Sequence, residues 1–204
     1  MPTILITGFG PFPGAPFNPT GPLVERLARV KRPGVKIVTH IFETSYKAVD
    51  RDLPKLMARY KPDALLMFGL ATRARIIRIE TRAQNALAAL PDAAGRTPKR
   101  AAIAKGKAEA QPMALPSHLI LQAIRTTGLR ARLSRDAGQY LCNYLCWRAT
   151  EATTSRNGPR LAAFVHVPLV AEKPVKTVKK KFTFDDLVIA GEAALRVVAK
   201  TCHD

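Results

Sequence analysis

The 204-residue sequence lacks the features that mark several common classes of protein. Cysteine occurs only three times, which gives no disulfide framework and fits a reducing, cytoplasmic compartment. No apolar run reaches the about 18 residues that a membrane-spanning helix needs, so we expect no membrane partner. The opening residues, MPTILITG, lack the basic segment of a signal peptide. We therefore expect one globular domain over residues 1–204.

Acidic residues are also scarce, since 15 Asp and Glu face 33 Lys and Arg and leave a net charge of +18. Such a charge can attract nucleic acid, anionic membranes or acidic substrates. The cations are spread along the chain, however, and the densest run, residues 173–181, has no aromatic residues for base stacking. We interpret the charge as a solvated surface and expect no specific nucleic acid partner, with a nucleic-acid-associated protein as an alternative.

Signals for metals and cofactors are missing as well. The three cysteines and four histidines show no ligand spacing. The glycine-rich residues 8–22 (GFGPFPGAPFNPTGP) carry prolines where a phosphate loop needs N–H donors. We expect no metal and no cofactor. This rigid loop holds three phenylalanines, which either line a pocket or cap the core.

Strand-like and helix-like segments alternate along the chain, which predicts an α/β fold with a largely parallel sheet covered on both faces. Ser45 is an N-cap candidate, and Pro54 predicts a kink or break. Residues 86–114 are weakly patterned and predict a surface excursion or a short hairpin arm. The predicted strands are residues 3–7, 35–42, 63–70, 76–80, 129–134 and 161–167, and the predicted helices are residues 23–30, 45–60, 116–127, one containing residue 142, and 183–201.

A possible nucleophile lies in the segment SRDAGQYLCNYLCW, residues 134–147. A turn opens into a helical run with Cys142 near its start, where the helix dipole and free N–H groups favour a thiolate. The alternative is a buried structural cysteine. Cys146, one turn later, is interpreted as a core residue.

A thiolate nucleophile usually needs an imidazole base and a group that orients it. His166 ends the apolar strand LAAFVHV, at the edge where open α/β sheets bind ligands, although a core histidine is an equal alternative. Glu80 ends another apolar segment and Asp136 lies close to Cys142 in sequence, so the acidic partner stays open.

Several segments together resemble the pyroglutamyl peptidase I (pyrrolidone-carboxylate peptidase) family of cysteine peptidases. They are TGFGPF (7–12) with NPT (18–20), GLA (69–71), Glu80 with Ala83 and Asn85, Ser134 with AGQYLCNY (137–144), and FVHVP (164–168). The resemblance implies a three-layer α/β/α sandwich around a mostly parallel twisted sheet. It also implies hydrolysis of an N-terminal pyroglutamyl residue from peptides, and a homo-oligomer, either a dimer or a tetramer.

By motif position, the resemblance makes Cys142 the nucleophile of a thioester mechanism, His166 its base and Glu80 the orienting group. It further implies that Phe9 and Phe12 sandwich the lactam ring, that backbone groups of Leu70 and Ala71 pair with its amide, and that Asn18 helps to hold the loop. The family's Arg after the Asn85 motif is replaced by the apolar run ALAAL (86–90). The alternative is therefore a non-catalytic or repurposed relative that binds a lactam or another small amide.

Overall fold

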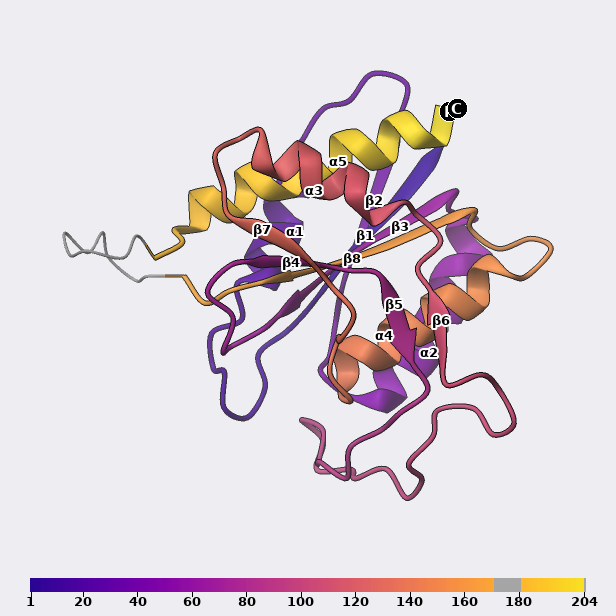
Figure 1. The fold of residues 1–204 in the computed structure, drawn as a ribbon. Coiled ribbons are helices and arrows are strands. Elements are labelled where there is room, and N and C mark those ends of the chain that lie inside the picture. The colour runs from indigo at the N-terminus through magenta and orange to yellow at the C-terminus, as the bar shows by residue number, and fades with distance from the viewer. Residues whose placement is uncertain (171–180, 204) are drawn as a thin grey trace.

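A computed structural model describes residues 1–170 and 181–203 of the chain. Of the basic run at residues 173–181, residues 173–180 lie outside the described residues. The described residues form a layered structure with a central sheet and helices above and below it (Figure 1).

Within the described residues, the main sheet has six strands in the order β2-β1-β3-β8-β4-β7. Strands β2, β1, β3 and β8 are parallel to one another, whereas β4 pairs antiparallel with β8 and parallel with β7. The prediction of a largely parallel sheet is therefore confirmed. The strands are β1 (Thr3–Phe9), β2 (Lys36–Phe42), β3 (Ala64–Leu70), β4 (Ile77–Glu80), β7 (Ala131–Ser134) and β8 (Leu161–Val167).

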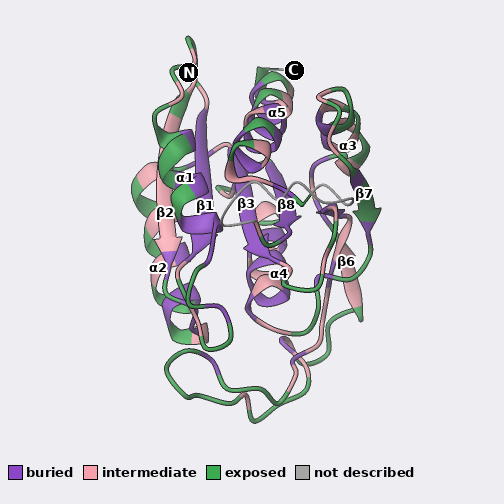
Figure 2. Cartoon of the chain, turned by 90° about the vertical axis from the view of Figure 1, so that its left-hand side faces the viewer, coloured by how far each residue is buried: buried purple, intermediate pink, exposed green. Residues whose placement is uncertain are grey.

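Helices pack on both faces of this sheet. The helices α1 (Thr20–Ala28), α3 (Ser117–Arg125) and α5 (Phe184–His203) lie on one face, and α2 (Tyr46–Tyr60) and α4 (Leu141–Thr153) lie on the other (Figure 1). Alternate residues of a strand point to opposite faces, so Ile4 and Ile6 join one apolar cluster while Leu5 and Phe9 join the second. Figure 2 shows β1, β3 and β8 buried between the helical layers. The predicted α/β/α sandwich is confirmed.

Two prolines affect the helices less than the sequence suggested. Helix α1 begins at Thr20 and contains Pro22 in its first turn, where a backbone N–H has no helical partner to lose. The predicted loop over residues 8–22 is therefore shorter at both ends, because β1 also reaches Phe9. Helix α2 continues past Pro54 to Tyr60, so the prediction of a break at Pro54 is wrong. Burial of Val49 and Leu53 against the sheet offsets the hydrogen bond that Pro54 removes.

The segment predicted as an excursion or hairpin arm begins and ends in a short antiparallel pair. Strand β5 (Arg82–Gln84) pairs with β6 (Ala110–Pro112), and the chain between them lies below α4 in Figure 1. Leu87 and Ile103 of this connection are buried in the apolar cluster that contains α4. The hairpin is thus anchored to the core.

Candidate active site

Glu80 and His166 meet in the interior of the molecule, on neighbouring strands. Nδ1 of His166 lies 2.8 Å from Oε1 of Glu80, so the ring N–H donates to the carboxylate. The antiparallel register pairs Glu80 with Phe164 and Arg78 with His166, which puts the two side chains on the same face. Their exposed fractions are 0% for Glu80 and 5% for His166. The second oxygen of Glu80, Oε2, has no hydrogen-bond partner among the described residues. Within the described residues, the carboxylate therefore makes its hydrogen bond to His166 alone.

Cys142 approaches this pair from the first turn of α4. Tyr140, the N-cap residue, makes no side-chain cap, so the first N–H groups of the helix keep their capacity to bind an anion. The sulfur lies directly over Gly69 of β3. A Cβ placed on Gly69 would be only 2.7 Å from Sγ of Cys142 and 2.6 Å from the Phe164 ring, so no larger residue fits there. Tight packing against a strand backbone therefore fixes the position of the sulfur.

The charges around His166 favour its protonated form. Burial by itself lowers the pKa of His166, but the negative charge and hydrogen bond of Cys142, together with the hydrogen bond and charge of Glu80, raise that pKa to about 9. His166 therefore interacts with both the Cys142 sulfur and the Glu80 carboxylate, and these contacts favour the imidazolium form. A cysteine beside a histidine is the pairing that a nucleophilic thiol and its base require.

The other cysteines lie in different surroundings. Cys146 is fully buried one turn along α4, and burial, with the nearby charges of Cys142 and Glu80, raises its thiol pKa well above the usual value. Burial likewise raises the pKa of Cys202. These raised pKa values keep both thiols protonated at neutral pH. The interpretation of Cys146 as a core residue is confirmed by its place in the apolar cluster.

The competing acidic and imidazole candidates lie elsewhere. Asp136 is exposed, and its Oδ1 accepts hydrogen bonds from the Gly138 amide and the Gln84 side chain. His40 lies 3.6 Å from Asp52 of α2, while His118 and His203 are exposed. Of the acidic and imidazole candidates, Glu80 and His166 are therefore the two that meet each other, and His166 is the histidine that interacts with Cys142.

The phenylalanine loop is held by a network centred on Asn18. Its Nδ2 donates to the Gly10 carbonyl at 3.0 Å, and its Oδ1 accepts from the amide and hydroxyl of Thr20. Phe9 is only 2% exposed, and its ring centroid lies 5.9 Å from that of Phe42. Phe12 is half-buried in a turn that pairs it with Ala15. The two rings therefore differ, since Phe9 packs in the core while Phe12 keeps exposed surface.

Leu70 and Ala71 lie where β3 ends, next to the strand of His166. The Ala71 amide donates to the Val167 carbonyl at 2.9 Å, and the Ala71 carbonyl accepts from Ala74 at 2.9 Å. Leu70 is buried opposite Val167 in the parallel ladder. The backbone N–H of Ala71 is therefore already used in its bond to Val167. The carbonyl oxygen of Ala71 accepts one hydrogen bond and can accept a second.

Asn143 is a residue of the site whose role the sequence analysis did not assign. It is fully buried, its Oδ1 accepts from the Gln84 amide at 2.8 Å, and its Nδ2 donates to the carbonyls of Gln84 at 2.8 Å and Ala86 at 3.1 Å. These bonds join α4 to β5, the strand that follows Glu80. An amide directly after the candidate nucleophile was the available signal.

Two grooves of the structure do not include Cys142, His166 or Glu80 in their linings. No group of three His, Cys, Asp or Glu residues capable of holding a metal ion occurs in the described ranges. A groove of about 1010 Å³ lies near the far end of α4, beside Arg148 and Ala152, and thus away from Cys142. A second groove, of about 910 Å³, lies along β5 and the connection to β6.

Comparison with known proteins places this geometry in a family. The sequence model of the family described as pyroglutamyl peptidase matches residues 2–201. The chain belongs to the pyroglutamyl peptidase family. The resemblance found in the sequence is thereby confirmed.

Relatives of the family match over most of their length. The pyrrolidone-carboxylate peptidase of Pyrococcus furiosus is 30% identical over 178 residues, which cover 87% of this chain and 86% of the relative. Pyrrolidone-carboxylate peptidase 1 of Ralstonia nicotianae is 31% identical over 202 residues, covering 98% and 93%. The solved structure of the pyrrolidone carboxyl peptidase from Thermococcus litoralis superposes with a TM-score of 0.91 at 27% identity, covering 100% of this chain and 96% of that one. The family fold thus extends over the whole described chain.

Proposed function

We propose that this chain is a cysteine peptidase of the pyroglutamyl-peptidase I type, which removes an N-terminal pyroglutamyl residue from peptides. Its membership of the pyroglutamyl peptidase family supports the reaction. The observation that carries the mechanism is the buried contact of 2.8 Å between His166 and Glu80, together with the interaction of Cys142 with the same imidazole.

The proposed reaction begins with the Cys142 thiolate attacking the carbonyl carbon that links pyroglutamate to the next residue. The backbone N–H of Cys142, at the uncapped start of α4, stabilises the oxyanion. Protonated His166 then gives its proton to the leaving amine, the C–N bond breaks, and a thioester remains. Neutral His166 next accepts a proton from water, the hydroxide attacks the thioester, and pyroglutamate leaves as the thiolate re-forms.

Glu80 orients the imidazole and stabilises its positive charge through Nδ1. With no other polar contact among the described residues, its buried Oε1 and Oε2 favour the imidazolium form strongly. The carboxylate stays ionised throughout the proposed cycle and takes up no proton itself.

Recognition of the lactam is proposed to involve Phe12, Phe9 and the end of β3. A neutral lactam has flat apolar faces and an amide edge, which suit aromatic rings and backbone hydrogen bonds. Because Phe9 packs against Phe42, we propose that the half-buried Phe12 supplies most of the stacking surface. The Leu70 backbone and the Ala71 carbonyl would pair with the amide, and the ladder bonds of Ala71 keep that segment rigid.

The decisive experiment measures hydrolysis of pyroglutamyl-aminomethylcoumarin by the reduced protein. We expect turnover in the wild type and a loss of at least about 10⁴-fold in Cys142→Ala and His166→Ala, because the nucleophile and base act as a unit. Cys146→Ala is the matched control, since it removes a thiol one turn away and should retain activity. Binding of pyroglutamate by a folded wild type without turnover would instead support the non-catalytic alternative.

We further propose that the protein works in a reducing, cytoplasmic compartment. Within the described part of the chain, no helix is long and apolar enough to cross a membrane. All three cysteines are free, and the reaction needs a reduced Cys142.

A further inference from the structure

We propose that a basic groove beside the active site binds carboxylate groups of the peptide that follows the pyroglutamyl residue, so that acidic peptides are preferred substrates. This inference rests on the proposed peptidase function and adds a substrate class to it. The groove occupies about 910 Å³, enough for several extended residues. Its lining includes the charged residues Arg82, Arg100, Lys105, Lys107 and Glu109, together with five alanines.

The walls of this groove are held in place by hydrogen bonds and by one buried side chain. Asn85 donates to the carbonyls of Ala104 at 2.8 Å and Lys107 at 3.4 Å, and its Oδ1 accepts from the Ala104 amide at 2.8 Å. Ile103, between the basic residues of the outer wall, is 1% exposed and packs in the core. The cations on either side of Ile103 are therefore presented from a fixed backbone.

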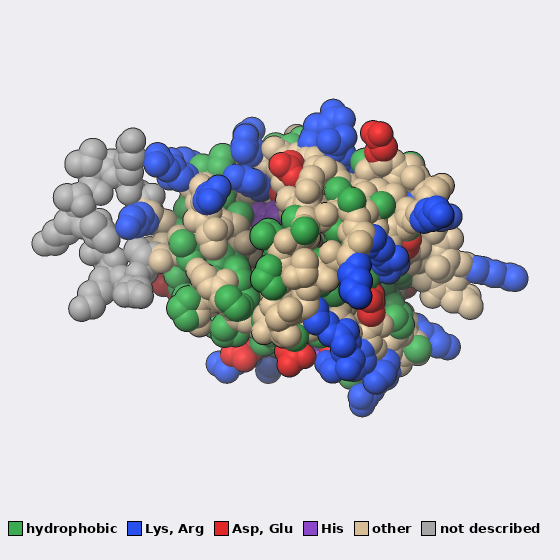
Figure 3. All heavy atoms as spheres, turned by 90° about the horizontal axis from the view of Figure 1, so that it is seen from below, with side chains coloured by type: hydrophobic (Ala, Val, Ile, Leu, Met, Phe, Trp, Pro, Cys, Tyr) green, Lys and Arg blue, Asp and Glu red, His purple; other side chains and the backbone are tan. Residues whose placement is uncertain are grey.

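The groove is strongly positive. Four cations, Arg82, Arg100, Lys105 and Lys107, face one acidic residue, Glu109. No salt bridge between described residues neutralises any of these four cations. Arg82 uses its Nε to donate to the Arg135 carbonyl, which orients the guanidinium without cancelling its charge. Seen from below, this side of the molecule carries many more Lys and Arg than Asp and Glu (Figure 3).

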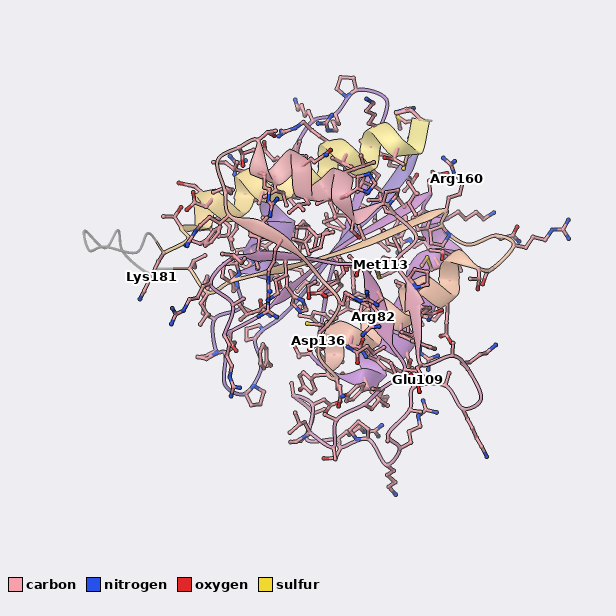
Figure 4. All side chains as sticks on the ribbon, in the orientation of Figure 1. Arg82, Glu109, Met113, Asp136, Arg160 and Lys181 are labelled. Carbon is pink, nitrogen blue, oxygen red and sulfur yellow. The ribbon has the colours of Figure 1, made fainter. Side chains whose placement is uncertain are left out.

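Sequence and hydrogen bonds connect the groove to the catalytic residues. Arg82 follows Glu80 by two residues, and Gln84 is bonded through its backbone to Asn143, the neighbour of Cys142. In Figure 4, Arg82 lies close to Asp136, at the segment that leads into α4, while Glu109 lies lower on the hairpin. The proposal places the residues that follow the scissile bond, in an extended conformation of about 3.3 Å per residue, along this strand.

The composition of the groove favours peptide carboxylates over nucleic acid. Its lining contains five alanines and no aromatic residue, so it offers no surface for stacking bases. Arginine and lysine bind carboxylates through charge-assisted hydrogen bonds, and the small alanines leave room for a peptide backbone. Oligonucleotide binding is therefore an outcome that the experiment must separate.

The test compares kcat/KM for pyroglutamyl-Ala-Glu-Glu, pyroglutamyl-Ala-Ala-Ala and pyroglutamyl-Ala-Lys-Lys. We expect the acidic peptide to exceed the neutral one by about 5-fold or more at low salt, because two or three partly exposed ion pairs each contribute modestly. Raising the salt concentration should reduce this preference. Equal values for the three peptides would overturn the proposal.

Two triple variants locate the effect. Arg100→Ser/Lys105→Ser/Lys107→Ser should remove the acidic preference while leaving hydrolysis of pyroglutamyl-aminomethylcoumarin unchanged. Arg26→Ser/Arg29→Ser/Lys31→Ser makes the same change in net charge at exposed positions in or just after α1, on the opposite face of the sheet, and should keep the preference. If both variants lose the acidic preference equally, the preference comes from overall charge and the groove proposal is overturned.

The controls separate the two levels of the proposal. If the wild type fails to cleave the coumarin substrate, the proposed function fails; if it cleaves that substrate without preferring acidic peptides, only the groove fails. A single-stranded oligonucleotide is added to both enzymes as a competitor of the acidic peptide. If it inhibits cleavage by the wild type but not cleavage by the groove variant, nucleic acid is the occupant and the peptide proposal is contradicted.

Discussion

Glu80 and His166 lie where neither side chain can be solvated, so each depends on the other for its charge. An isolated buried carboxylate or imidazolium is costly, whereas a hydrogen-bonded pair offsets much of that cost. Interaction with Cys142 also raises the pKa of the same ring. The protonated imidazole is therefore stabilised by both neighbours.

This arrangement predicts how activity depends on pH. Acylation needs protonated His166 to release the leaving amine, so kcat/KM should fall as the pH rises through about 9, the raised pKa of His166. Glu80→Gln removes one of the interactions that raise this pKa, so it should move the alkaline fall to lower pH. It should also cost less activity than Cys142→Ala, because it leaves the nucleophile in place.

The measurement is a pH–rate profile of coumarin release for the wild type and Glu80→Gln. Asp52→Asn is the control, because it removes the carboxylate beside His40, a second histidine–acid pair away from the nucleophile. A profile for Glu80→Gln that coincides with that of the wild type would show that Glu80 does not act on His166.

At the scale of elements, the site depends on how helix α4 is fixed against strand β5. Cys142 lies in the first turn of the helix, and β5 begins two residues after Glu80. The three hydrogen bonds of buried Asn143 join these elements directly. The Thr81 amide, which donates to Ser134 at 2.8 Å, holds the connection between β4 and β5 against β7.

We predict that Asn143→Ala lowers kcat by about 10²-fold with a smaller effect on KM, because misplacing a nucleophile by about 1 Å can cost that much. Loss of its buried bonds should also lower stability by about 1–3 kcal/mol. Steady-state kinetics and thermal unfolding measure the two effects separately.

Gln84→Ala is the matched control for this prediction. It removes the side-chain bonds of Gln84 to Arg135 and Asp136 but keeps the backbone groups that Asn143 binds. If both variants are folded and have the same kcat, a positioning role for Asn143 is contradicted.

The molecule as a whole has an open sheet edge and exposed large apolar side chains. Strand β7 ends the main sheet, and Leu133 on it is 41% exposed, while Phe17 in the phenylalanine loop is 53% exposed. Unpaired edges and exposed large apolar side chains favour association. We propose a homo-oligomer, a dimer or a tetramer, as the sequence resemblance implied.

Light scattering coupled to size exclusion tests this proposal. We expect a mass of two or four times the 22.3 kDa of the chain at micromolar concentration. Leu133→Glu should shift the distribution toward monomer if β7 takes part in the interface, whereas Ile189→Glu makes the same change at a comparably exposed position on α5. A wild type that elutes at 22.3 kDa throughout would rule the oligomer out.

The sequence by itself determined the elements and the chemical types of the active-site residues. Buried strands are recognisable from continuous apolar runs such as that before His166, and a helix after the Gly138 turn is recognisable from its pattern, because both depend on local composition. The family motifs then predicted Cys142, His166 and Glu80 as the catalytic set. The predicted helix over residues 45–60 is confirmed as α2 with Ser45 as its N-cap, and only the break considered at Pro54 is wrong, since packing of α2 against the sheet outweighs the local cost of the proline.

Only the tertiary structure decided which acidic group serves the histidine. Glu80 and His166 are 86 residues apart, and Asp136, much closer to Cys142 in sequence, points elsewhere. The antiparallel register of β4 on β8 and the bonds of Asn143 are set by contacts between distant segments, and those contacts depend on how whole faces pack. A local pattern specifies which residues can be buried, whereas packing specifies which buried residues meet.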